Sequence, residues 1–250
     1  MSGHSKWHSI KHKKGAADAK RGKLFAVLIR QIEVAARAGG GDPATNATLR
    51  TMIQKGRDNS LPIDNINKAV KRGIGEEEGV LYEAINYEGY APHGVAMYVQ
   101  CLTDNRNRTG SEIKNIFNKT GGSFAEPGAV AWQFERKGIV LVEKSAADED
   151  DLMLLAAEAG AEDVSDAGDE WAVTTPMAEL HAVRTAIEAE GIKVKSSDLT
   201  MIPSTSIAID DENSAKQVLR LLDALEDHDD VEAVYGNFDI AEDILQTLMG

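Results

Sequence analysis

Cysteine is almost absent from this sequence of 250 residues, in which Cys101 is the only one. A single cysteine excludes an intramolecular disulfide, so we expect a protein of the reducing cytoplasm. Long apolar runs are also absent: none reaches the roughly 18–20 residues of a membrane span, and the N-terminus lacks the apolar core of a signal peptide. We therefore expect no membrane association. Cys101 itself lies in the apolar run Val95–Leu102, which predicts a buried thiol and not a nucleophile.

Patterns typical of enzymes are missing as well. No order of Ser, His and Asp suggests a nucleophile with its base. The triplet Gly39-Gly40-Gly41 is not followed by the Gly-Lys-Ser/Thr of a phosphate-binding loop. The acidic runs Asp148–Asp151 and Glu226–Asp230 lack the alternation of a calcium loop, so we expect them to be solvated loops and helix ends. We expect no catalysis, no cofactor and no small-molecule substrate.

Three histidines near the N-terminus are the strongest candidate metal ligands. His4, His8 and His12 recur every four residues, which places them on one face if the segment is helical. No carboxylate or thiol accompanies them, and the neighbouring lysines repel a divalent cation. If Met1 is removed, a free Ser-Gly-His terminus is an alternative site for Cu(II). We expect no physiological metal site.

Charge is divided unevenly along the chain, although the whole sequence has a net charge of −14 and a pI of about 4.9. Residues 1–75 hold 15 Lys and Arg against 5 Asp and Glu, a net charge of +10. The remaining residues hold 12 against 36, a net charge of −24. Such a molecule meets an anionic partner with its basic end, while the acidic remainder fixes the orientation.

Residues 1–23 form a basic arm with too few apolar side chains to fold alone. Trp7 lies among its lysines, where a flat ring can stack on an exposed base while ammonium groups contact phosphates. The alternative is a solvated tail with Trp7 folded onto the surface of a domain. The arm's candidate nucleic-acid contacts are Lys6, Trp7, Lys11, Lys13, Lys14, Lys20, Arg21 and Lys23.

The chain becomes helical after the arm. Leu24, Leu28 and Ile32 recur every four residues in a helix that the triplet Gly39–Gly41 ends. A second set of residues recurs every seven positions and is expected to extend the basic surface onto folded structure: Lys23, Arg30 and Arg37.

Two more helices follow. Asp42 before Pro43 predicts an N-cap and a second helix that runs to about Asp58. A third helix begins at Pro62 and closes at Gly73. Three short amphipathic helices with brief connections predict a bundle with a basic exterior.

Beyond the acidic residues 76–79 the apolar pattern changes to that of strands. The elements expected first are strands at Leu81–Tyr90 and Gly94–Leu102, a helix opened by the capping box Thr109–Glu112, and a strand at Val130–Phe134. Ile139–Lys195 then predicts strand, helix, strand, strand, helix and strand, the ferredoxin-like βαββαβ order. The elements expected last, which complete the first sheet, are a strand near Ile207–Ile209, a helix over Asn213–Leu225 and a strand at Val231–Tyr235.

The sequence therefore predicts an α+β protein of three domains behind the arm. A helical bundle spans residues 24–78. A discontinuous α/β sandwich-like domain combines residues 79–136 with 204–250, and a ferredoxin-like domain of residues 137–203 is inserted into it.

One polar loop of the acidic part contains two arginines, in the run Asp104-Asn105-Arg106-Asn107-Arg108. Asn and Asp suit capping and turns, which we expect to be their role. For Arg106 and Arg108 two roles stay open: turn chemistry, or contact with RNA phosphate or sugar.

Several motifs resemble those of the YebC/PmpR family. These motifs span most of the chain: Gly3–Trp7, Lys11–Lys14, Asp18–Lys23, Gly39–Pro43, Tyr87–Tyr90, Asp104–Thr109 and Met201–Ser204. The resemblance implies a three-domain α+β protein of the cytosol with a role in gene expression. Members are described as DNA-binding transcriptional regulators or as translational activators at the ribosome, some of which ease synthesis through proline-rich stretches. The positions here that match the family's nucleic-acid contacts are the basic arm and the first helix.

We expect a non-enzymatic regulator of gene expression that binds nucleic acid. Ribosomal RNA and the ribosome are favoured, because a Lys/Trp arm suits the unstacked bases of folded RNA and the acidic remainder suits basic ribosomal proteins. No helix-turn-helix recognition pair is evident, but a DNA-binding transcriptional regulator is one alternative. Another is a protein-interaction adaptor whose acidic surfaces bind partners while the arm is incidental.

Overall fold

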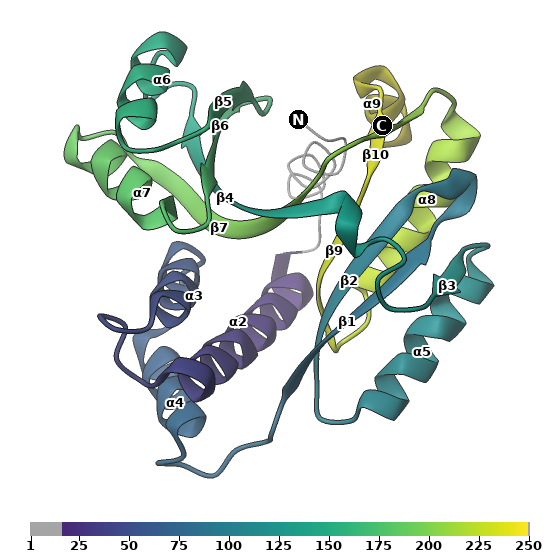
Figure 1. Cartoon of the computed structure of the whole chain (residues 1–250), viewed down its shortest axis with the longest axis horizontal. Helices are drawn as coiled ribbons and strands as arrows, with labels where there is room; N and C mark the ends of the chain where they lie inside the picture. The colour runs from purple at the N-terminus through teal and green to yellow at the C-terminus, as the bar shows by residue number, and fades with distance from the viewer. Residues whose placement is uncertain (1–16, 250) are drawn as a thin grey trace. The chain divides into compact units, whose positions relative to one another are not determined.

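A computed structural model describes residues 17–249. They form two compact units: the first joins the residues up to Gly79 with Arg136–Met201, and the second joins Val80–Glu135 with the residues from Ile202 onward. The mixture of helices and sheets confirms the predicted α+β class (Figure 1). The four-part domain division stays a prediction. No helix within residues 17–249 is both long and apolar enough to span a lipid bilayer.

The first unit contains a bundle of three helices, α2 (Ala17–Gly39), α3 (Ala47–Asp58) and α4 (Ile63–Ile74). Their apolar faces share one buried core, which includes Leu28, Ile32, Leu49, Ile53 and Ile66. The helices α2 and α4 cross closely at Gly73, where an added Cβ would lie 2.5 Å from the carbonyl oxygen of Glu33. A side chain at this position would force the two helices apart.

Two helix starts differ from the prediction. α2 already includes residues 17–23, which lie within the segment predicted to be an arm. α3 begins at Ala47 and not at Pro43, because Asn46 is its N-cap. The Asn46 side chain accepts from Leu49 N at 3.0 Å and donates to the carbonyl oxygen of Ala35 at 2.8 Å, so it caps α3 and ties it to α2. Asp42 closes a separate turn by accepting from Ala44 N at 2.9 Å.

The first unit also contains a ferredoxin-like subdomain, whose βαββαβ order confirms the prediction. Its elements are β4 (Phe134–Glu143), α6 (Glu149–Glu158), β5 (Asp163–Asp166), β6 (Glu170–Pro176), α7 (Leu180–Ala189) and β7 (Val194–Pro203). The sheet order is β5-β6-β4-β7, with β6 antiparallel to both β5 and β4. α6 and α7 lie on one face of this sheet (Figure 1), where Val140, Leu152, Val183 and Ile187 are fully buried.

The second unit is built on the sheet β3-β1-β2-β9. Its elements are β1 (Glu83–Tyr90), β2 (Ala96–Thr103), α5 (Arg106–Lys119), β3 (Ser123–Ala125), β8 (Ile207–Ile209), α8 (Glu212–Glu226), β9 (Val231–Gly236), β10 (Phe238–Ile240) and α9 (Glu242–Met249). Ile113 and Phe117 of α5 and Leu222 of α8 pack into its core. β9 pairs with β2, so this strand completes the first sheet as predicted. The strand β8 does not join that sheet, because it pairs with β10 in a separate two-stranded sheet. Cys101 is buried in this core, which confirms the expectation of a buried thiol.

Two predicted elements of the second unit are wrong. α5 begins at Arg106, because Asn105 caps it by accepting from Arg108 N at 3.1 Å; Thr109 is buried inside the helix and opens no capping box. Val130–Phe134 is not a strand but contains the 3₁₀ turn η2 (Ala131–Gln133). The backbone N–H groups of Val130 and Ala131 bond to the carboxylate of Glu88, so they are not available to a neighbouring strand. The elements β3, β10 and α9 were not among those predicted.

Candidate nucleic-acid interface

The seven-residue spacing of Lys23, Arg30 and Arg37 predicts an exposed basic stripe on α2, but all three side chains are half-buried. Arg37 lies near the buried carboxylate of Glu33, which also accepts an ion pair from Arg72 of α4, at 2.7 Å between Nη2 and Oε1. Burial raises the pKa of Glu33 above its usual range, and the positive charges of Arg72 and Arg37 offset only part of this rise. The charge of Arg37 is therefore directed to Glu33 of its own helix, and Arg37 does not form part of an exposed stripe.

The cations that face solvent in the bundle lie on other elements. Lys68 and Lys71 are exposed one turn apart on α4, and neither pairs with a carboxylate of the described residues. Asn67 is exposed beside them, and the exposed Ile63 and Ile74 stand near the two ends of the helix. We call these five residues the α4 surface.

The other predicted contacts of the N-terminal region are placed as follows. Arg21 is exposed on α2, with its guanidinium carbon 5.6 Å from the ring centroid of Phe25. Lys20 also lies on α2. The remaining arm residues lie outside the part that the structure describes: Lys6, Trp7, Lys11, Lys13, Lys14 and the histidines His4, His8 and His12.

Arg106 and Arg108 both lie in the first turn of α5 but differ in their surroundings. Arg106 has a side chain that is 64% exposed, and its Nε lies 3.8 Å from a carboxylate oxygen of Glu83. Arg108 Nη2 donates to Asp230 Oδ2 at 2.7 Å and to Asp104 Oδ1 at 2.9 Å. The protein therefore neutralises Arg108 itself, and Arg106 is the better placed of the two for an external anion.

Asp230 is the centre of a buried polar network, although the run Glu226–Asp230 is predicted to be solvated. It accepts hydrogen bonds from Thr109 Oγ1 at 2.6 Å and from Thr103 Oγ1 at 3.3 Å, besides the one from Arg108. Burial alone raises the pKa of Asp230, but the hydrogen bonds from Thr109 and Arg108 and the charge of Arg108 lower it below its usual range. The network joins the end of β2 and the first turn of α5 to the start of β9.

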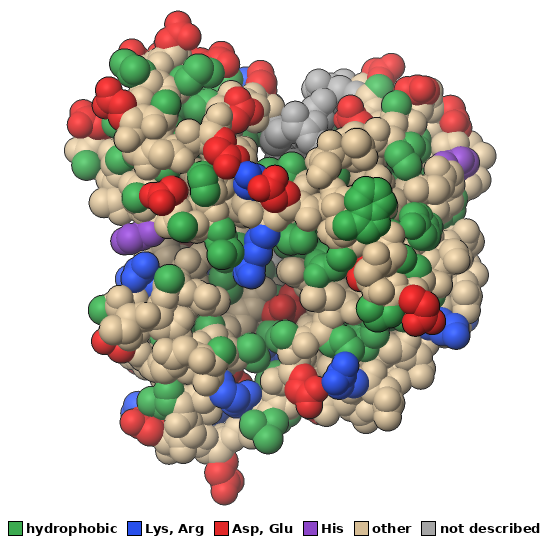
Figure 2. Space-filling view, in the orientation of Figure 1, with side chains coloured by type: hydrophobic (Ala, Val, Ile, Leu, Met, Phe, Trp, Pro, Cys, Tyr) green, Lys and Arg blue, Asp and Glu red, His purple; other side chains and the backbone are tan. Residues whose placement is uncertain are grey.

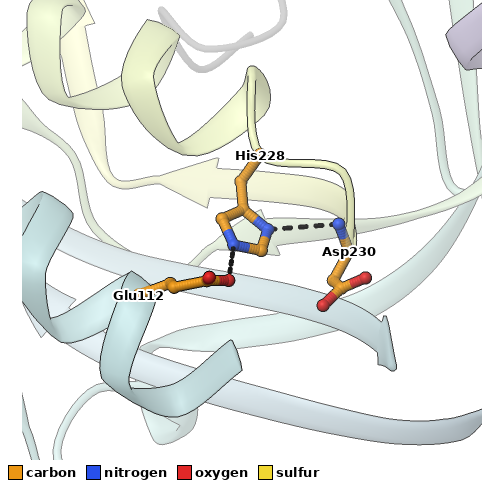
Figure 3. Close-up of side chains that lie close together, drawn as sticks. All are labelled: Glu112, His228 and Asp230. Atoms are coloured by element: carbon orange, nitrogen blue, oxygen red, sulfur yellow. Dashed lines mark hydrogen bonds and ion pairs between the residues drawn. The ribbon is translucent and has the colours of Figure 1, made fainter. Parts of the chain in front are cut away.

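Within residues 17–249, one group of side chains has the closeness of a metal site: Glu112, His228 and Asp230, whose ligand atoms lie within 4.8 Å of one another (Figure 3). His228 Nε2 lies 2.9 Å from Glu112 Oε2, and His228 Nδ1 accepts from Asp230 N at 3.1 Å. Both ring nitrogens are thus engaged, and Arg108 already supplies positive charge to Asp230. The arrangement fits an ion-pair network that anchors α5, and it does not fit a metal centre.

Trp132 on η2 is 76% exposed and was not among the predicted contacts. Glu88 fixes the loop that contains Trp132. The buried Glu88 carboxylate accepts hydrogen bonds from the backbone N–H groups of Gly128, Val130 and Ala131 at 2.6–2.8 Å. Burial raises the pKa of Glu88, but these three hydrogen bonds lower it below its usual range. Trp132 is therefore presented to solvent on a fixed loop, and the turn pair Pro127-Gly128 just before it is the sequence feature that marks a loop here.

Comparison with known proteins places both units among described families. The model of the TACO1/YebC protein N-terminal domain matches residues 5–76, and that of the TACO1/YebC second and third domain matches residues 82–238. Proteins of Halothermothrix orenii and Thermobifida fusca, each named "Probable transcriptional regulatory protein", are 52% and 54% identical to this chain, over 99% and 98% of both partners. The crystal structure of a conserved hypothetical protein from Aquifex aeolicus superposes with a TM-score of 0.85 at 45% identity, covering 95% of this chain and 98% of that one.

Proposed function

Because the chain belongs to the TACO1/YebC family, whose members similar to it are named as transcriptional regulators, we propose that it regulates gene expression by binding RNA. The site of action is the ribosome in the cytoplasm, and the contacts come from the basic N-terminal region. The protein acts by binding and not by catalysis.

The observation that carries this proposal is the unneutralised charge of the α4 surface. Lys68 and Lys71 face solvent without a carboxylate partner among the described residues, in the part of the chain that has a net charge of +10. Several basic side chains of the acidic remainder are, in contrast, paired within the protein: Arg108, Lys137, Lys144, Arg184 and Lys195. Exposed and unpaired lysines beside a basic arm suit a phosphate backbone.

RNA is favoured over DNA because the α4 surface offers little for reading bases. Lysine binds phosphate as a point charge, whereas base readout relies on bidentate Arg, Asn or Gln held rigidly in a groove. Arg72, the arginine of α4, turns inward to Glu33. Duplex binding by this helix is therefore expected to depend little on sequence, while the unstacked bases of folded RNA can stack on the arm's Trp7.

The test compares two double variants of the full chain in their binding to ribosomal RNA. Lys68→Ala with Lys71→Ala removes the α4 cations, and Lys114→Ala with Lys119→Ala removes two exposed lysines of α5 as the matched control. The first variant should weaken binding and reduce the slope of log K against log salt by about one for each phosphate that the protein no longer neutralises. The control variant should leave both the RNA affinity and the salt slope unchanged. Equal effects of the two variants would argue against an interface on α4.

A competition experiment separates the proposal from its alternatives. Labelled promoter duplex is challenged with random duplex, ribosomal RNA and ribosomes. We expect ribosomes to compete best, and the two duplexes to compete alike. A preference of about a thousandfold for promoter DNA, with no competition by ribosomes, would instead support a DNA-binding transcriptional regulator. Binding that does not respond to salt would support the protein-interaction adaptor.

A further inference from the structure

The outward face of α6 combines exposed apolar side chains with carboxylates. Leu154 is 66% exposed and Met153 is 42% exposed, although both are large apolar residues on a regular helix. Helical spacing places Asp150 and Asp151 one turn before Leu154, and Glu158 one turn after it. We call these five residues the α6 surface.

Within residues 17–249, no basic side chain neutralises the charge of the α6 surface. Asp150, Asp151 and Glu158 have no Lys, Arg or His within ion-pair distance in the described part of the chain, and α6 itself contains no basic residue. Three lysines of the same subdomain pair with other carboxylates, as Lys137–Glu162, Lys144–Asp166 and Lys195–Glu170. Glu158 moreover lies in the last turn, where the helix dipole favours a cation.

An open hollow of about 610 Å³ adjoins the α6 surface through Asp150. Asp148 and Glu149 also line it, together with Lys144 and Trp171. The Lys144 ammonium lies 4.5 Å from the Trp171 ring centroid and is paired with Asp166, so it does not neutralise the carboxylates of the hollow. Acidic and hydrophobic side chains accordingly gather side by side over α6 (Figure 2). The hollow has room for a cationic side chain of a partner.

We propose that the α6 surface docks a basic segment of another protein. The segment sets an apolar side chain against Leu154 and Met153 and directs Lys or Arg toward Asp150, Asp151 and Glu158. A methionine beside an exposed leucine adapts to apolar groups of different shapes, and a rim of carboxylates selects the basic partner. RNA is repelled by this surface. A second copy of the chain placed symmetrically on it would bring like charges together. The inference is independent of the RNA contacts proposed for the bundle.

The test measures the binding of a labelled synthetic helical peptide built from Lys and Leu. Leu recurs every three to four residues in this peptide, so that one face of the helix is apolar and the other is basic. Full-length Leu154→Ser protein should bind it at least about tenfold more weakly, as expected for a central apolar anchor. Met177→Ser is the matched control, since Met177 is also an exposed apolar residue of this subdomain, and it should bind within twofold of the unmodified protein. Far-UV circular dichroism verifies that each variant is folded.

Two double variants test the carboxylates of the α6 surface. Asp151→Asn with Glu158→Gln should weaken the peptide several-fold and flatten the salt dependence of binding. The control is Glu179→Gln with Glu190→Gln, which removes two exposed carboxylates elsewhere in the subdomain and should leave peptide affinity and its salt dependence unchanged. All four variants should keep the RNA affinity of the unmodified protein.

Three results would overturn the proposal. The first is equal peptide binding by the Leu154→Ser and Met177→Ser proteins. The second is a dimer in sedimentation experiments that Leu154→Ser dissociates, which would assign the surface to a second copy. The third is loss of RNA affinity on Leu154→Ser, which would assign it to nucleic acid.

Discussion

Breaking the ion pair between Arg184 and Asp58 should strongly destabilise the first unit. Arg184 on α7 is buried, and its guanidinium donates two hydrogen bonds to the Asp58 carboxylate at the end of α3, at 2.6 and 3.0 Å. The same group donates to Ser197 Oγ at 2.7 Å. Within the first unit this pair connects the helical bundle to the ferredoxin-like subdomain. Arg184→Ala leaves the buried Asp58 carboxylate without its cation, which typically costs about 3–5 kcal/mol. Asp58→Ala is milder, because Arg184 keeps its ion pair with Glu188, at 2.9 Å between Nε and Oε1.

The assay is a double-mutant cycle followed by urea unfolding of the full-length protein. Arg184→Ala should lower the free energy of unfolding of the first unit by about 3–5 kcal/mol, and Asp58→Ala should lower it by less, because Glu188 still pairs with Arg184. The double variant should lose less than the sum, with a coupling of about 2 kcal/mol. Lys55→Ala is the control, because its pair with Asp198 at 2.6 Å is partly exposed and should contribute less than about 1 kcal/mol. Additive effects, or losses no larger than that of the control, would refute the reasoning.

Five further outcomes are expected from the arm and from the buried acids. Deleting residues 1–16 should remove most RNA affinity in a filter-binding assay while the unfolding midpoint stays unchanged, and Trp7→Ala alone should weaken binding by about 1–3 kcal/mol. Asp230→Ala should destabilise the second unit by about 3 kcal/mol in urea, because Thr109 and Arg108 lose their acceptor. The folded-state pKa values of Glu88 and Asp230 are lowered, so the stability that these residues contribute is present at neutral pH and is lost as the pH falls below about 4.5. Glu88→Gln should reduce this loss of unfolding free energy at acid pH, measured by urea unfolding at a series of pH values. The folded-state pKa of Glu33 is raised, so its effect has the opposite sign. The bundle should lose stability as the pH rises through the raised pKa of Glu33, and Glu33→Gln should remove this pH dependence of the unfolding free energy.

Local patterns in the sequence predicted most elements of the fold. The four-residue recurrence of Leu24, Leu28 and Ile32 predicted α2, and these residues lie in or against the core of the bundle. The order of short apolar runs predicted the βαββαβ subdomain. Helix starts were less predictable, because several Asn and Asp residues can each cap a helix. Asn46 starts α3 because it also bonds to α2, which is a tertiary contact that local sequence does not reveal.

The candidate site was less predictable than the fold, because its electrostatics depend on distant partners. Arg108 contacts Asp230, which is 122 residues away, and Glu88 bonds to backbone groups some 40 residues away. Charge counts along the chain identified the basic end correctly but did not distinguish Arg72, paired with Glu33, from the exposed Lys71 beside it. Which cations face solvent is decided by the packing of α2 on α4.

The pairing of β2 with β9 has a consequence for how the chain is made. Thr103 at the end of β2 and Asp230 just before β9 are separated by 127 residues, and the ferredoxin-like subdomain is synthesised between them. At about 5–20 residues per second, one edge of β2 stays unpaired in the growing chain for roughly 6–25 s, although β1 already pairs with the other edge. An unpaired strand edge is a template for aggregation, so the open edge of β2 has to be protected from other chains during this interval. A chain that ends between Lys119 and Val231 keeps β1, β2 and α5 but lacks the strand that completes their sheet.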